Sequence, residues 1–118
     1  MTRKKILQRL VTPLLALGAL QVTAQITTEQ GQLFANNCLQ CHAYAHVGAP
    51  LAGNAEHWRG RNRKGLDQLV INTIEGIDKM PPLGNCSACS EADFRAIIRM
   101  MAGLPARAAE NTGGDNEP

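Results

Sequence analysis

The residues with the clearest chemistry lie in the segment Cys38-Leu39-Gln40-Cys41-His42, which has the pattern C-x-x-C-H. This pattern is the one used for covalent attachment of haem. Two thiols at this spacing can each add to one vinyl group of the macrocycle, and the histidine that follows can donate an imidazole nitrogen to the iron. We therefore expect thioethers from Cys38 and Cys41 and an axial ligand from His42. Two free cysteines and an unrelated histidine are the alternative interpretation.

A haem iron held by His42 has a second axial position, and Met80 is the candidate that the sequence favours. Its thioether is a soft ligand, and two prolines directly after it restrict the backbone. His57 is the alternative ligand, whereas His46 follows His42 too closely to reach the opposite face of the haem. The methionines of the last predicted helix are expected to fill the core. A His/Met pair raises the reduction potential of haem iron and is typical of electron-transfer cytochromes.

Cys86 and Cys89 form a second C-x-x-C pair. Ser90 follows where haem attachment needs a histidine, so this pair is not a second haem site. Zinc held by both pairs is one alternative, but 44 residues separate Cys41 from Cys86, whereas zinc ribbons separate their pairs by about 15–20. In an exported protein a local Cys86–Cys89 disulfide is the favoured interpretation. It would stiffen the chain between Met80 and the last helix.

The first 24 residues have the pattern of a secretory signal peptide. Four basic residues come first, an apolar run follows over residues 10–20, and small residues at 22 and 24 offer a cleavage site. The basic residues are Arg3, Lys4, Lys5 and Arg9. The apolar run is shorter than the roughly 20 residues that span a bilayer, with an uncleaved anchor as the alternative. We expect export to the periplasm, with cleavage near Ala24.

Composition limits what the remaining chain can be. The 118 residues include 12 Lys and Arg against 10 Asp and Glu, but the leader carries four of the basic residues and none of the acids. The mature chain is therefore acidic, and the basic balance of the full sequence gives no reason to expect a nucleic-acid partner. Only four residues are aromatic: Phe34, Tyr44, Trp58 and Phe94. Small domains with so thin a core usually carry disulfides, metals or cofactors, and a buried haem would supply the missing apolar body.

Three helices are expected to position these groups: residues 27–40, which carry the haem cysteines, residues 65–75, and the residues after Ser90 up to about 102. The caps expected for the first and last are Thr27 or Thr28 and Ser90. The last helix has its apolar face at i, i+3, i+4 and i+7, namely Phe94, Ile97, Ile98 and Met101. The polar segment of residues 56–63 is expected to form a short helix or turn around Trp58. The domain is expected to span residues 25–105, with a mobile acidic tail over 106–118.

The segment from Lys79 to Asp93, KMPPLGNCSACSEAD, closely resembles the bacterial cytochrome c5 group of class I cytochromes c. That group combines a C-x-x-C-H near the N-terminus with M-P-P, a C-x-x-C and a Ser-capped C-terminal helix, in this order. The resemblance covers about residues 30–103. Further matching positions are Gly48-Ala49-Pro50, Trp58, Arg61 and Lys64-Gly65.

The resemblance implies an all-α, small class I cytochrome c fold, with three main helices wrapped around one covalently bound haem c. It implies axial ligation by His42 and Met80 and a Cys86–Cys89 disulfide. It further implies that the Pro50 carbonyl accepts a hydrogen bond from His42 and that two other side chains, Trp58 and Arg61, lie near a haem propionate.

The chain also departs from the group's pattern in two places: where the first and last helices touch each other, and just before the ligand methionine. Gln30 stands where the group usually has a glycine, and Gly31 is one place late. Met100 stands where an aromatic residue usually faces that contact. Asp78 and Lys79 replace the small residues common before the ligand methionine. These differences concern helix packing and docking, not the ligands.

The expected function is that of an exported monohaem electron carrier. It would exchange single electrons with periplasmic or membrane-bound redox proteins. It is not expected to be an enzyme or to bind a small-molecule substrate. One alternative is a haem subunit of a redox enzyme complex, which would need an iron position open to substrate. A haem-free zinc or disulfide module is another.

Overall fold

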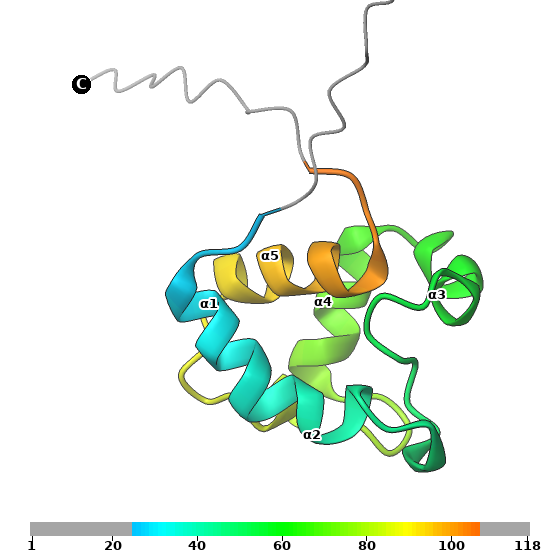
Figure 1. Ribbon diagram of the computed structural model, residues 1–118, viewed down its shortest axis with the longest axis horizontal. Helices are drawn as coiled ribbons and strands as arrows, with labels where there is room; N and C mark the ends of the chain where they lie inside the picture. The colour runs from blue at the N-terminus through cyan, green and yellow to red at the C-terminus, as the bar shows by residue number, and fades with distance from the viewer. Residues whose placement is uncertain (1–24, 107–118) are drawn as a thin grey trace, which may run out of the picture.

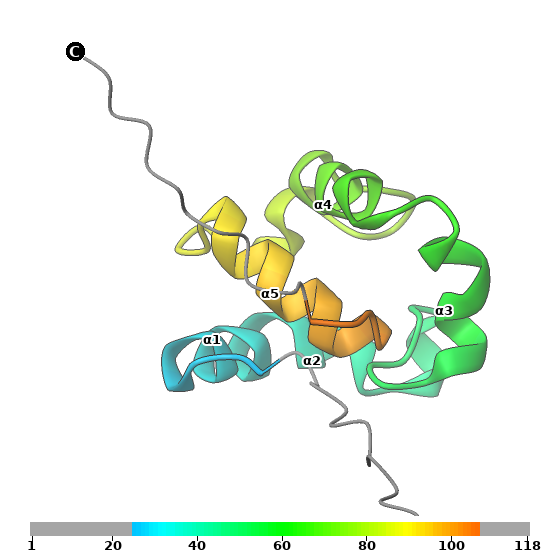
Figure 2. The same ribbon diagram turned by 90° about the horizontal axis from the view of Figure 1, so that it is seen from above.

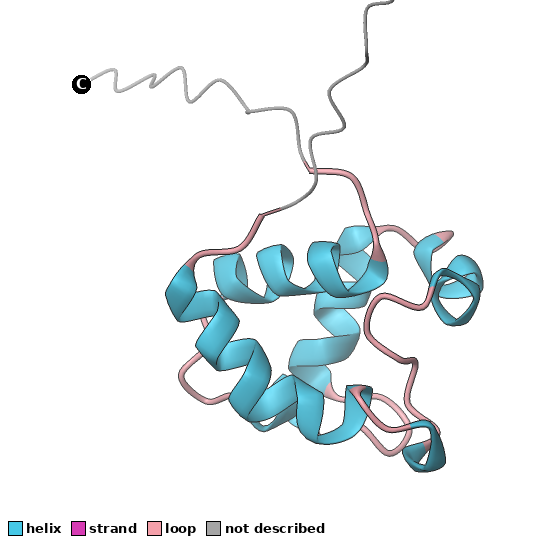
Figure 3. Cartoon of the chain, viewed as in Figure 1, coloured by secondary structure: helices cyan, strands magenta, loops and turns pink. Residues whose placement is uncertain are grey.

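The computed structural model describes residues 25–106, and its regular elements are helices apart from one bridge between Ile77 and Met80 (Figure 3). The all-α prediction is confirmed. The α-helices are α1 (Thr28–Leu33), α2 (Leu39–His42), α3 (Ala55–Asn62), α4 (Leu66–Glu75) and α5 (Glu91–Ala102). The predicted signal peptide and all but the first residue of the predicted tail lie outside the described residues. Among residues 25–106, no helix is long and apolar enough to cross a bilayer.

The first helical run carries the C-x-x-C-H motif, as predicted, but it is not a uniform α-helix. It begins at a capping box in which Thr27 and Gln30 exchange hydrogen bonds between side chain and backbone. It then widens into a π-helical turn, η1 (Phe34–Cys38), and continues as α2. The Asn37 side chain donates to the Leu33 carbonyl at 2.9 Å. The run therefore ends at His42 rather than near Gln40, and a π-turn of the kind often found at functional sites precedes α2.

Helix α5 forms the centre of the fold. Ser90 caps it in a second capping box with Asp93, and Gly103 ends it at φ +67°. Its predicted apolar residues, Phe94, Ile97, Ile98 and Met101, are all buried. The helix packs against α1, α3 and α4, and Figures 1 and 2 show it lying between the α1–α2 run and α4, with α3 at the far end.

Most of the buried apolar residues form two clusters, and Ile97 belongs to neither. One contains Leu69, Val70, Cys86, Phe94 and Ile98, and the other contains Trp58, Met101 and Ala102. Leu104, which is partly buried, packs against both. Small domains usually have one contiguous core. The division into two clusters is consistent with a further apolar group that the protein atoms alone do not supply.

Helix α4 buries only one side of its apolar surface. Leu69, Val70 and Thr73 are buried. The exposed fractions of Ile71, Ile74 and Ile77 are 44%, 36% and 40%. These isoleucines are apolar surface of α4 and of the following turn that the protein atoms described here leave uncovered.

Candidate haem site

His42 is the best-defined group of the site. It lies at the end of α2 and is only 6% exposed. Its Nδ1 lies 2.7 Å from the carbonyl oxygen of Pro50. Because a carbonyl can only accept, Nδ1 must carry the proton, and the lone pair of Nε2 is left available for a metal. The predicted contact between His42 and this loop is confirmed.

The loop that holds His42 is itself fixed from both sides. Ala52 N donates to the His42 carbonyl at 2.9 Å. Leu51 N donates to His57 Nδ1 at 3.1 Å, and Trp58 Nε1 donates to the Leu51 carbonyl at 2.8 Å. The Trp58 ring also lies nearly parallel to the His42 imidazole, with the ring centroids 6.1 Å apart. Helix α3 therefore positions the loop, and the loop positions the imidazole.

His57 has a role that the sequence did not reveal. The sequence offers it as an alternative iron ligand, and in the structure its Nδ1 accepts the Leu51 amide hydrogen. Its own backbone N–H donates to Asn54, the cap of α3. The only available signal was its place in the first turn of a short helix, one residue before Trp58.

Cys38 and Cys41 are not joined by a disulfide, and both lie in the helical run that ends at His42. Cys38 is partly buried and Cys41 is exposed. Burial raises the pKa of the Cys38 thiol. Within residues 25–106, no three His, Cys, Asp or Glu side chains gather into a metal-binding group, so the structure does not assemble the two C-x-x-C pairs into the zinc site that the sequence left open.

Met80 lies at the end of a tight turn. Ile77 N donates to the Met80 carbonyl at 3.0 Å, and Met80 N donates to the Ile77 carbonyl at 2.8 Å. Asp78 in the turn has a φ of +54°, and the 3-10 turn η3 (Pro82–Asn85) follows. These paired hydrogen bonds fix the Met80 backbone. Its role as a ligand remains a prediction.

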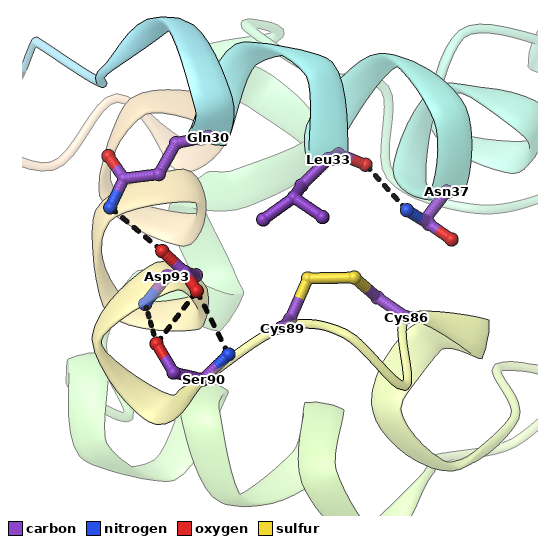
Figure 4. The surroundings of a disulfide bond; sticks show 7 residues. All are labelled: Gln30, Leu33, Asn37, Cys86, Cys89, Ser90 and Asp93. Carbon is purple, nitrogen blue, oxygen red and sulfur yellow. Dashed lines mark hydrogen bonds between the residues drawn. A yellow bond between two sulfur atoms is a disulfide. The ribbon is translucent and has the colours of Figure 1, made fainter.

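The chain after Met80 is joined to the start of α5 by a disulfide between Cys86 and Cys89, whose Cα atoms are 5.4 Å apart. Cys86 is 1% exposed and belongs to the cluster around Phe94. Leu33 of α1 packs against this cluster and lies over the disulfide (Figure 4). The second C-x-x-C pair thus connects the Met80 segment, α5 and α1.

The basic residues of α3 make hydrogen bonds within their own segment. Arg61 donates from Nη1 to the His57 carbonyl at 2.6 Å, and Arg59 pairs with Glu56. The Trp58 indole N–H is used by Leu51. A position of Trp58 and Arg61 near a haem propionate stays a prediction.

This geometry agrees with what known proteins show. The family model described as "Cytochrome C oxidase, cbb3-type, subunit III" matches residues 26–101. Cytochrome c5 of Ectopseudomonas mendocina is 38% identical over 74 residues, which cover 61% of this chain and 85% of that protein. This chain belongs to the cytochrome c5 group. Cytochrome c5 of Azotobacter vinelandii is similar at 36% identity over 72 residues, covering 59% of this chain and 87% of that protein.

The fold also matches that of a solved structure. A chain in the crystal structure of an electron transfer complex of nitrite reductase with cytochrome c matches with a TM-score of 0.60 and 30% identity, covering 68% of this chain and 98% of that one. Cytochromes of this family carry covalently attached haem c, which is therefore the cofactor here. The protein is a small haem-c electron-transfer cytochrome of the c5 group.

Proposed function

We propose that this member of the cytochrome c5 group is an exported one-electron carrier, with haem c attached to Cys38 and Cys41 and its iron ligated by His42 and Met80. The observation that carries the proposal is the buried His42 ring, whose Nδ1 is committed to the Pro50 carbonyl at 2.7 Å. That hydrogen bond fixes the tautomer and orientation that an iron ligand needs. Met80, on its hydrogen-bonded turn, supplies the second ligand.

The packing of the chain supports a large apolar group between these ligands. The buried side chains form two clusters joined only through the partly buried Leu104, as expected where a large apolar group occupies the space between them. The exposed isoleucines of α4 and of the turn before Met80 offer further apolar surface for it to cover. These residues therefore fit a haem.

Each part of the site has a role in the proposed transfer. When bound, the haem supplies the Fe(II)/Fe(III) couple, and a His/Met ligand pair raises its potential. The Pro50 carbonyl and the Trp58 ring hold the His42 imidazole in one orientation. A Met80 thioether bound to the iron would exclude oxygen, peroxide and carbon monoxide from it. An electron can then be exchanged with little rearrangement and without substrate chemistry.

We propose redox proteins of the periplasm or its membrane as partners. The leader pattern of residues 1–24 supports export. The matched solved chain comes from an electron transfer complex with a reductase, which supports a protein partner rather than a small substrate. The second candidate function, a haem subunit of a redox enzyme complex, is favoured by the description of the family model. Cell fractionation distinguishes the two candidate functions. A subunit would stay with the membrane complex, whereas a free carrier would be found in the periplasmic fraction.

The ligand assignment is tested on the holoprotein made with a cytochrome c maturation system. The oxidised wild type should show the Met–iron charge-transfer band, and Met80→Ala should lose it. The variant should keep its haem, have a lower reduction potential and bind carbon monoxide when reduced. Met100→Ala on α5 is the matched control and should keep the band. A Met80→Ala protein with an unchanged potential would show that Met80 is not the ligand.

A further inference from the structure

Two glycines flank α4 with nearly the same backbone conformation but with different surroundings. Gly65 precedes the helix at φ +83° and ψ 159°, and Gly76 follows it at φ +84° and ψ 151°. This region of backbone space is essentially restricted to glycine. A Cβ added at Gly65 would meet nothing within 4 Å. A Cβ added at Gly76 would lie 2.9 Å from the Pro82 nitrogen and 3.0 Å from the Met80 carbonyl oxygen.

The atoms near Gly76 cannot move aside independently. Both belong to the main chain, and the Cδ of the Pro82 ring would be only 3.1 Å away. The Met80 carbonyl also accepts the Ile77 N–H that closes the turn. The proline ring fixes φ at residue 82. A methyl group at position 76 therefore has to displace the backbone on the C-terminal side of Met80.

We propose that Gly76 is a positioning residue for Met80. The absence of a side chain there lets the end of α4 lie directly against the 80–82 backbone, so that the helix determines where the Met80 sulfur is held. This inference rests on the proposed ligation by Met80. It assigns Gly76 a role beyond ending the helix, which is all that its sequence position indicates.

Gly84 contacts the same methionine in a different way. A Cβ at Gly84 would lie 3.0 Å from Met80 Cε, which is the far end of a flexible side chain. A rotation of the methionine could relieve that contact, whereas the contacts at Gly76 involve backbone atoms. Gly76 is therefore the position from which the ligand backbone itself is displaced.

The matched pair of glycines provides the test. Gly76→Ala and Gly65→Ala both place alanine at a positive φ, so both holoproteins should lose thermal stability. Only Gly76→Ala should also weaken or lose the Met–iron charge-transfer band, lower the reduction potential and bind carbon monoxide about tenfold faster or more at neutral pH. A Gly76→Ala protein with the band, potential and binding rate of Gly65→Ala would overturn the inference, as would equal loss of the band in both.

Two further measurements complete the test. If Gly76→Ala does not accumulate, it is combined with Asp78→Gly, which relieves the positive φ at Asp78 without adding an atom. The double variant should lack the band that Asp78→Gly alone retains. If it too fails to accumulate, the inference is wrong, because a displaced ligand should leave a folded protein with covalent haem. A wild type without the band would overturn the ligand proposal itself, whereas a wild-type band beside an unchanged Gly76→Ala overturns only the inference.

Discussion

Gln30 on α1 donates a hydrogen bond of 3.1 Å to Asp93 on α5, and each of these two side chains also closes the capping box of its own helix. Gln30 Oε1 accepts from Thr27 N, and Asp93 Oδ2 accepts from Ser90 N. Figure 4 shows the contact between Gln30 and Asp93, and the bonds between Asp93 and Ser90, beside the disulfide. The N-termini of two helices 63 residues apart are thus joined by one polar contact. A Cβ at the neighbouring Gly31 would meet only a side-chain atom of Ile26, at 3.9 Å, so glycine does not make a close helix contact here.

Gln30→Ala should destabilise the holoprotein by about 1 kcal/mol, because it removes both a cap acceptor and the contact with α5. The free energy of unfolding can be measured by denaturant titration followed by circular dichroism. Gln68→Ala is the control, since Gln68 is exposed and hydrogen-bonds only one turn along its own helix, to Asn72. Equal effects of the two substitutions would contradict a special role for Gln30.

Asp93→Asn should reduce the acid sensitivity of the fold. The hydrogen bonds from Ser90, followed by that from Gln30, lower the pKa of the Asp93 carboxyl. A carboxylate with a depressed pKa in the folded state contributes stability above its unfolded pKa of about 3.9, and this contribution is lost as the pH falls through the folded pKa. The variant should be less stable at neutral pH and lose less on acidification.

The comparison is made by thermal melting from about pH 6 to about pH 3. The pKa of Glu29 is also lowered, by hydrogen bonds from its own backbone and from Thr27, but Glu29 is present in both proteins. Glu75→Gln, an exposed change at the end of α4, should leave the wild-type profile unchanged. If the stability of Asp93→Asn changed with pH in parallel with that of the wild type, the ionisation of this carboxyl would not contribute to the pH dependence of stability.

Replacing Cys86 and Cys89 together by alanine should lower stability by about 2 kcal/mol, the value expected for closing so short a loop. Haem should remain attached, because the thioethers to Cys38 and Cys41 do not involve this pair. A thiol reductant should destabilise the wild type by a similar amount and leave the double variant unaffected. A wild type that a strong reductant does not change would mean that the two cysteines are not bonded in the purified protein.

Much of this fold follows from local sequence signals. Ser90 and Thr27 have cap chemistry, and the spacing from Phe94 to Met101 describes one helical face. All of these were found as expected because each depends on residues within one or two turns. The contact of His42 with the following loop was also foreseeable, because a ligating imidazole needs an acceptor and the loop is only eight residues away.

The remaining features depend on contacts between distant segments. The hydrogen bond of Gln30 spans 63 residues, and nothing near Gln30 in the sequence identifies its partner. The π-turn before α2 changes the helical register by one residue, which no apolar periodicity over so short a segment can resolve. The use of His57 as an acceptor for Leu51 required the folded loop.

Trp58→Phe should separate the two roles of this residue. Phenylalanine keeps an aromatic ring beside His42 but cannot donate to the Leu51 carbonyl, which the indole reaches at 2.8 Å. Loss of a hydrogen bond to a partly buried carbonyl, together with some packing, should cost about 1–2 kcal/mol. Tyr44→Phe, a change at an exposed aromatic residue, should cost much less. Since the Pro50 carbonyl would still accept from His42, the Met–iron band should persist in the variant. A Trp58→Phe protein as stable as the wild type would mean that the Leu51 contact does not hold the loop, and the imidazole would then depend on Pro50 and His57 alone.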